Sequence, residues 1–333
     1  MTRRVIDFHT HLAYRAGPVA DAVFAANGVT TAVRLTVRPS GEALRAILAE
    51  SAAMKTRVLV FAGVPWGLVD DPDFGALAAE DLHRSVTAGA RGLKISKALG
   101  LGVRTADGHL LAVDDPRLDP LWRAAGELGV PVAIHTGDPV AFFQPVDDHN
   151  ERIEELRAHP TWSFYGEDYP SLEELLAARD RMVARHPETT FVAVHVGGLA
   201  EDIDAVARSM RALPNLWIDI AARVPELGRH DPQKVRAFFM EMKDRILFGT
   251  DIQISRDRVV LGSGDPRAPA PGLKDAERYY DVHWRYLETD DRQFEHATPV
   301  QGRWKIDGID LPRDVLAAIY HGNAERLLKL DGP

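Results

Sequence analysis

The sequence predicts an α/β protein folded as a (β/α)8 TIM barrel, and two features of the chain favour this fold. Strands rich in β-branched and apolar residues alternate with helical segments along the whole length, as in parallel β-α-β units. About eight such units occur, the number that closes a barrel. An open doubly wound sheet is the alternative, but no Gly-x-Gly-x-x-Gly motif follows the first strand.

The first predicted strand is Val5–Leu12, with the sequence VIDFHTHL. Side chains alternate along a strand, so Val5, Asp7, His9 and His11 are expected to share one face. Two imidazoles at one strand end can hold a single divalent cation. The opening strand therefore predicts the beginning of a metal site.

The other strands follow from runs of β-branched and apolar residues bounded by Gly, Pro or polar residues. They are expected at Thr30–Thr36, Arg57–Pro65, Gly89–Lys97, Pro131–Gly137, Thr190–Gly198, Asn215–Ala221 and Arg245–Ile252.

The helices follow from helical periodicity and from end signals such as Gly28, Gly129 and the N-cap residue Ser171. They are expected at Pro18–Asn27, Gly41–Met54, Asp73–Ala88, Pro116–Leu128, Ser171–Arg185, Ala200–Ala212, Pro232–Lys243 and Leu311–Leu328.

Two segments exceed what a minimal barrel needs, residues 138–170 after the fifth strand and 255–308 after the eighth. Both are rich in aromatic and charged residues, and long loops in compact domains are usually functional or disordered. Because both follow strands, we expect them to form lids at the carboxyl end of the barrel. The prediction is one domain, 1–333, with two lid insertions.

Composition narrows the class of protein. The chain has 333 residues, a net charge of −9 and no cysteine, so disulfides and thiolate metal sites are excluded. A mildly acidic chain without basic runs argues against nucleic acid as a partner, and no apolar run is long enough to cross a membrane. We expect a cytoplasmic enzyme acting on a small molecule, and leave a homo-oligomer open.

Further polar residues stand at the ends of other strands. Lys94 belongs to the fourth strand, His135 to the fifth, His195 to the sixth and Asp251 to the eighth. Taken singly, each of them is more often a hydrogen-bonded core residue or a helix cap than a ligand. Together with His9 and His11 they would converge on one mouth of a closed barrel. A divalent metal, zinc before manganese or iron, is the economical interpretation.

This ordered set resembles the amidohydrolase superfamily of metal-dependent barrel hydrolases. The final segment Tyr320–Leu328, YHGNAERLL, is similar to the amidohydrolase-related branch, which also contains decarboxylases. The resemblance implies that His9 and His11 bind the more buried metal. It makes Asp251 a ligand and the general base.

The resemblance also implies roles for the remaining strand-end residues. His135 and His195 would bind a second ion, or would provide one ligand and one substrate-polarising group. Lys94 would bridge two ions if carboxylated. One or two ions are therefore compatible with this pattern.

Substrate-binding candidates lie near the expected mouth. Arg223 follows the seventh strand and would clamp a carboxylate or phosphate, although a salt bridge to a lid is equally compatible. Trp66, Phe143 and Trp162 would suit a flat ligand, or would pack the lids onto the barrel. Arg34 is expected to face inward and pair with Asp7.

Three functions are compatible with these residues. The first is a hydrolase that cleaves an amide, ester or lactone with metal-activated water. The second is a metal-dependent non-oxidative decarboxylase of an aromatic or unsaturated acid, which should present a cation such as Arg223 beside the metal. The third, a non-enzymatic binding protein with a residual site, is disfavoured by six convergent groups.

Overall fold

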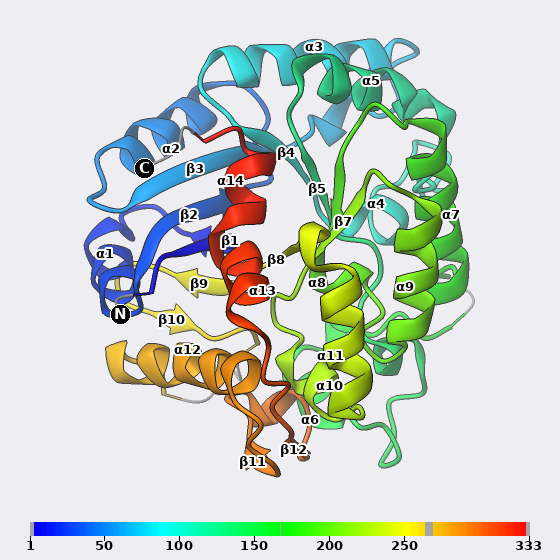
Figure 1. Cartoon of the computed structure of the whole chain (residues 1–333). Helices are drawn as coiled ribbons and strands as arrows, with labels where there is room; N and C mark the ends of the chain where they lie inside the picture. The colour runs from blue at the N-terminus through cyan, green and yellow to red at the C-terminus, as the bar shows by residue number, and fades with distance from the viewer. Residues whose placement is uncertain (1–2, 167, 264–268, 331–333) are drawn as a thin grey trace.

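The computed structural model describes residues 3–166, 168–263 and 269–330. A ten-stranded sheet in the order β10-β9-β1-β2-β3-β4-β5-β6-β7-β8 forms its centre (Figure 1). All paired neighbours from β9 to β8 are parallel, and β10 is antiparallel. The strands are β1 Val5–Leu12, β2 Val29–Leu35, β3 Arg57–Ala62, β4 Gly92–Ile95, β5 Val132–Ile134, β6 Phe191–Ala193, β7 Leu216–Asp219, β8 Ile246–Leu247, β9 Ile252–Ile254 and β10 Val259–Val260.

Helices surround the sheet in the order that the alternating pattern predicts (Figure 1). Those between the strands are α1 Gly17–Ala26, α2 Glu42–Ala52, α3 Phe74–Thr87, α4 Ala98–Leu101, α5 Asp119–Leu128, α7 Leu172–Arg185, α9 Ile203–Ala212, α10 Val224–Gly228 and α11 Pro232–Glu241. Ser171 caps α7 in a capping box with Glu174, as its position predicts.

The described parts of the two long segments are folded. Residues 138–170 contain the 3-10 turn Val140–Phe143, α6 Ile153–Ala158 and the 3-10 turn Pro160–Trp162. Residues 255–308 contain β10, α12 Leu273–Glu288 and the small sheet of β11 Phe294–Glu295 and β12 Lys305–Ile306. That they act as lids remains a prediction.

The predicted eighth strand Arg245–Ile252 is divided into two pieces. β8 pairs with β7, and its continuation β9 pairs with β1. Between the pieces, Phe8 N donates to Phe248 O (2.9 Å) and Asp251 N donates to His9 O (2.8 Å). The first and last strands therefore meet at a seam, which closes the predicted barrel.

The alternation expected along the first strand is broken. β1 shifts register against β2 between Asp7 and Thr10. The Asp7 carboxylate accepts hydrogen bonds from Tyr280 Oη on α12 and from Thr250 Oγ1, both at 2.7 Å. The predicted Arg34–Asp7 pair is wrong, because Arg34 faces α2 and donates to Glu50 Oε2 at 3.1 Å.

The predicted last helix Leu311–Leu328 is also interrupted. α13 Arg313–Ala317 and α14 Asn323–Leu327 flank a π-helical turn, Ala318–Gly322. Asn323 donates from Nδ2 to Lys243 O (2.6 Å) and Ile246 O (2.7 Å), so the start of α14 is hydrogen-bonded to β8 and to the residues just before it. Leu327 and Leu328 belong to the same buried cluster as Ile6 and Phe8 of β1.

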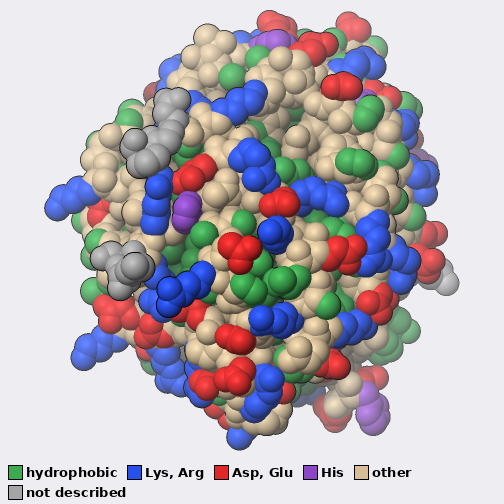
Figure 2. Space-filling view, in the orientation of Figure 1, with side chains coloured by type: hydrophobic (Ala, Val, Ile, Leu, Met, Phe, Trp, Pro, Cys, Tyr) green, Lys and Arg blue, Asp and Glu red, His purple; other side chains and the backbone are tan. Residues whose placement is uncertain are grey.

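The surface is of mixed charge. On the face shown in Figure 2, Lys and Arg side chains are interspersed with Asp and Glu, and small apolar groups lie between them. Within the described residues, no helix is long and apolar enough to cross a membrane.

Candidate metal centre

The two histidines of β1 are oriented through their Nδ1 atoms. His9 donates from Nδ1 to Asp219 Oδ2 (2.8 Å), and His11 donates from Nδ1 to Leu35 O (3.0 Å). These bonds place the proton of each neutral ring on Nδ1 and leave the Nε2 lone pair free. Such partners on the far side of an imidazole are typical of metal-binding histidines.

Asp251 meets both imidazoles at the break between β8 and β9. Its Oδ1 lies 3.4 Å from His9 Nε2 and 3.1 Å from His11 Nε2. The three candidate ligand atoms all lie within 4.8 Å of one another. Asp251 adopts a left-handed backbone conformation with φ of 61°, which is costly for a residue other than glycine.

His195 follows β6 on a left-handed turn, not on the regular strand that the sequence predicts. The four residues from His195 to Gly198 have φ values of 59°, 56°, 67° and 76°. Asp219 accepts from His195 N at 2.7 Å, and His195 Nδ1 donates to Ala221 O at 2.8 Å. The turn brings the His195 ring to 4.7 Å from that of His9 and 4.5 Å from that of His135, between centroids.

Lys94 and His135 complete the predicted group. Lys94 is buried, and its Nζ has no hydrogen-bond partner among the residues that the structure describes. Burial lowers the pKa of Lys94 to about 8, against the opposing effect of Asp219 and Asp251. His135 Nε2 lies 3.3 Å from Asp138 Oδ1 without hydrogen-bond alignment.

The electrostatics of this cluster fit a divalent cation. Burial holds the pKa values of His9 and His195 well below the usual range, so both rings are neutral and can act as ligands. Burial alone would raise the pKa of Asp251, but His9, His11 and Lys94 outweigh it and lower that pKa to about 2. Neutral imidazoles, an ionised carboxylate and buried polar atoms without partners together form a donor set suited to Zn²⁺, Mn²⁺ or Fe²⁺.

A cavity of about 240 Å³ opens onto these residues. His11, Lys94, His135, His195 and Asp251 line it. Its other lining residues come from several loops and include Lys97, Phe142, Glu155, Trp162, Arg223, Gln253 and Gln301. The structure thus brings the predicted strand-end residues to one place, whereas their roles as ligands remain predictions.

The aromatic candidates are placed differently from one another. Trp162 lines the cavity, and Lys97 Nζ lies 5.0 Å above its ring centroid. Phe143 packs on Phe164 with centroids 5.5 Å apart, and the neighbouring Phe142 lines the cavity instead. Trp66 packs on Phe74 with a centroid distance of 6.0 Å and is not among the cavity-lining residues.

Sequence reasoning gave no role to the residue that links most of this site, Asp219. It is fully buried at the end of β7 and holds both His9 and the backbone of His195. One feature of the sequence could have indicated Asp219: it is a carboxylate among apolar neighbours in the strand NLWIDIA.

The closed barrel and the buried histidine–carboxylate cluster define an enzyme of the metal-dependent barrel class. A model of the amidohydrolase family matches residues 6–330, and the chain belongs to this family. The fold and the family that the sequence predicted are therefore confirmed.

Three relatives illustrate the similarity. The gamma-resorcylate decarboxylase of Rhodococcus jostii (strain RHA1) is 28% identical over 233 residues, which cover 66% of this chain and 64% of that protein. The 2,6-dihydroxybenzoate decarboxylase from Rhizobium superposes with a TM-score of 0.57 at 18% identity, over 99% of this chain and 100% of the other. An amidohydrolase from Burkholderia multivorans with bound zinc superposes with a TM-score of 0.51 at 15% identity, over 99% and 100% of the two chains.

Proposed function

We propose that this chain is a metal-dependent non-oxidative decarboxylase of an aromatic carboxylic acid. The observation that carries the proposal is Arg223, a buried guanidinium that lines the cavity beside His195 and Asp251. Its Nη1 donates to Ala222 O (2.9 Å). Among the described residues Arg223 forms no ion pair, whereas the buried carboxylates of Glu155 and Glu226 pair with Arg152. A buried cation without an anion is costly, and a substrate carboxylate would satisfy it.

The similarity to decarboxylases supports the same assignment and favours it over the hydrolase that the sequence suggested first. Hydrolysis would use the same histidines and carboxylate, so these residues alone do not separate the two reactions. A cation fixed beside the metal site supports decarboxylation, because the carboxylate that it would bind is the group that a decarboxylase removes.

We assign roles to the residues as follows. His9, His11 and Asp251, with His135 and His195 close by, would hold the ion. A divalent cation bound there would polarise the acid and stabilise the negative charge that develops as CO₂ leaves. Arg223 binds the substrate carboxylate, and Phe142 and Trp162 give the ring an apolar wall. The ionised Asp251 carboxylate would accept a proton from water or from a substrate hydroxyl and pass it to the ring carbon as CO₂ leaves.

We further propose that residues 1–333 form one domain and that 138–170 and 255–308 cover the site. Both segments contribute side chains to the cavity, through Trp162 and Gln301 for example. Excluding water from the site strengthens its electrostatic interactions with the substrate.

The test is a product screen with metal-reconstituted protein. Hydroxylated benzoates, including 2,6-dihydroxybenzoate, are assayed for CO₂ release, and aryl esters, lactones and amides are assayed in parallel for hydrolysis. We expect CO₂ release from at least one benzoate. Arg223→Gln should lower kcat/KM by about 10- to 100-fold, the loss expected for a hydrogen bond to a charged group.

The matched control is Arg123→Gln, an exposed arginine of α5 far from the cavity, which should leave kcat/KM unchanged. Hydrolysis without CO₂ release from any acid would overturn the proposal.

A further inference from the structure

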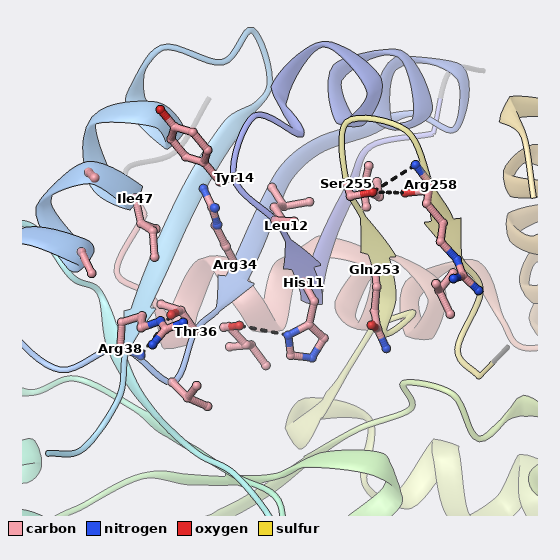
Figure 3. A pocket seen from close by; sticks show the side chains of 17 residues that line it. His11, Leu12, Tyr14, Arg34, Thr36, Arg38, Ile47, Gln253, Ser255 and Arg258 are labelled. Atoms are coloured by element: carbon pink, nitrogen blue, oxygen red, sulfur yellow. Dashed lines mark hydrogen bonds between the residues drawn. The ribbon is translucent and has the colours of Figure 1, made fainter. Parts of the chain in front are cut away.

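A second and larger cavity, of about 720 Å³, opens beside the metal centre. It lies between α2 and the β9–β10 hairpin, across the carboxyl ends of β1 and β2 (Figure 3). His11, Val37 and Gln253 line both this cleft and the cavity at the metal centre. The His11 side chain is 36% exposed whereas that of His9 is 1% exposed, so the two cavities meet at His11.

The cleft is lined by cations. Arg34, Arg38 and Arg258 contribute to its wall, and none of its lining residues is acidic. Arg38 is exposed, and its side chain forms no ion pair within the described part of the chain. In a chain with a net charge of −9, such a wall attracts anions.

The Arg34 side chain is fixed by two residues of α2, Glu50 and Ser51. It is 3% exposed, and its Nη1 donates to Glu50 Oε2 and to Ser51 Oγ, both at 3.1 Å. Its Nε has no hydrogen-bond partner among the described residues. Figure 3 shows the Arg34 side chain between Leu12 and Ile47, inside the cleft. Arg34 is therefore a fixed, already paired part of the wall, and the exposed Arg38, which has no ion pair among the described residues, is the cation that can meet an anion in the cleft.

The remaining wall suits a chain of carbon atoms. Ala43, Ala46 and Ile47 of α2 line it and leave it open, because two of them are small. In Figure 3 the side chains of His11 and Gln253 lie next to each other, and Arg38 lies beyond Thr36 on the α2 side. A linear arm could therefore pass from the metal cavity along His11 towards Arg38.

We propose that this cleft is a subsite for a substrate arm that ends in an anionic oxygen group, a carboxylate or a phosphate. The aromatic acid occupies the metal cavity, and the arm extends from its ring past His11 and Gln253 to Arg38. The proposal rests on the proposed function and narrows the substrate to aromatic acids with a second, distal anion.

The test measures binding by calorimetry and does not depend on turnover. The probes are 4-methylbenzoate, 5-(4-carboxyphenyl)pentanoate, its phosphonate counterpart, and the ester that is methylated only at the distal carboxylate. For the wild type we expect at least one doubly charged probe to bind about tenfold more tightly than the monomethyl ester, the gain typical of an exposed charge-assisted hydrogen bond. Comparing carboxylate with phosphonate identifies the preferred anion.

Arg38→Gln should abolish this preference and leave 4-methylbenzoate binding unchanged, whereas the control Arg123→Gln should keep it. Ala46→Trp, an exposed position of α2 that lines the cleft, should weaken both long charged probes and not 4-methylbenzoate. Absence of the preference in the wild type, its survival in Arg38→Gln, or no binding of any probe would overturn the proposal. Tight binding of a doubly charged probe by a protein that releases no CO₂ would refute the proposed function alone.

Discussion

Asp219 connects more parts of the metal centre than any residue predicted from the sequence, and Asp219→Asn tests this connection. The carboxylate accepts three hydrogen bonds, from His9 Nδ1 (2.8 Å), His195 N (2.7 Å) and Ala221 N (3.1 Å). The two backbone donors share Oδ1, and His9 alone uses Oδ2. An asparagine can retain the backbone bonds through its one oxygen, but its amide then faces His9.

The tautomer of His9 decides the outcome. Facing an N–H donor, the ring keeps its Nδ1 hydrogen bond only by accepting, which moves its proton to Nε2. Nε2 is the atom 3.4 Å from Asp251 Oδ1, and a protonated Nε2 cannot bind a metal. Losing a hydrogen-bond partner behind a ligand typically weakens metal binding about 10- to 100-fold, or about 1.4 to 2.7 kcal/mol.

The assay is a competition titration of zinc between the protein and a chromophoric chelator, with the melting temperature of the metal-free protein followed in parallel. We expect the dissociation constant to rise 10- to 100-fold while the metal-free protein remains folded. Asp202→Asn is the control, because Asp202 caps α9 through Ala205 N and asparagine caps equally well. Wild-type zinc affinity in Asp219→Asn would refute the assignment of His9 as a ligand through Nε2.

Three further predictions concern stability. Tyr280→Phe should lower the free energy of unfolding by about 1.5–3 kcal/mol in a urea titration, because the buried Asp7 carboxylate loses a 2.7 Å hydrogen bond. The control is Tyr286→Phe, which should leave the free energy of unfolding unchanged because its buried hydroxyl has no partner among the described residues. Gly198→Ala should lower the free energy of unfolding by at least about 2 kcal/mol, because φ of Gly198 is +76° and the new Cβ would lie 2.3 Å from Thr136 O. The control Gly67→Ala, whose Cβ would meet nothing within 4 Å, should not show this loss. Burial lowers the pKa of His283 from 6.5 to about 4, so the unfolded chain binds the extra proton first and stability falls as pH drops through this window. Between pH 6.5 and 4 the free energy of unfolding of His283→Gln should fall less steeply than that of the wild type. The two slopes should differ by at most about 1.4 kcal/mol per pH unit, and identical slopes in variant and wild type would contradict this cause.

The positions of the strand-end residues could be predicted because the carboxyl ends of parallel strands meet in a barrel. That rule needs only the order of the strands. It predicted that the strand-end residues converge, and in the structure one cavity is lined by His11, Lys94, His135, His195 and Asp251.

Other features depend on local geometry that alternation cannot reveal. In β1, which shifts register here, the Asp7 carboxylate is held by Tyr280 while the His9 ring is held by Asp219. Arg34 faces α2 instead of Asp7. In the 3-10 turn Val140–Phe143, spacing does not decide which aromatic points inward, and Phe142 rather than Phe143 lines the cavity.

The seam of the barrel has a consequence for how the protein is made. Asp251 is translated 240 residues after His11, so both histidines leave the ribosome well before it. A nascent chain that ends before Asp251 has both imidazoles, but it lacks the backbone N–H that donates across the seam to His9 O and the carboxylate that faces the two rings. Such a chain cannot assemble the three-residue group of His9, His11 and Asp251, so a metal ion can enter this group only after Asp251 has left the ribosome.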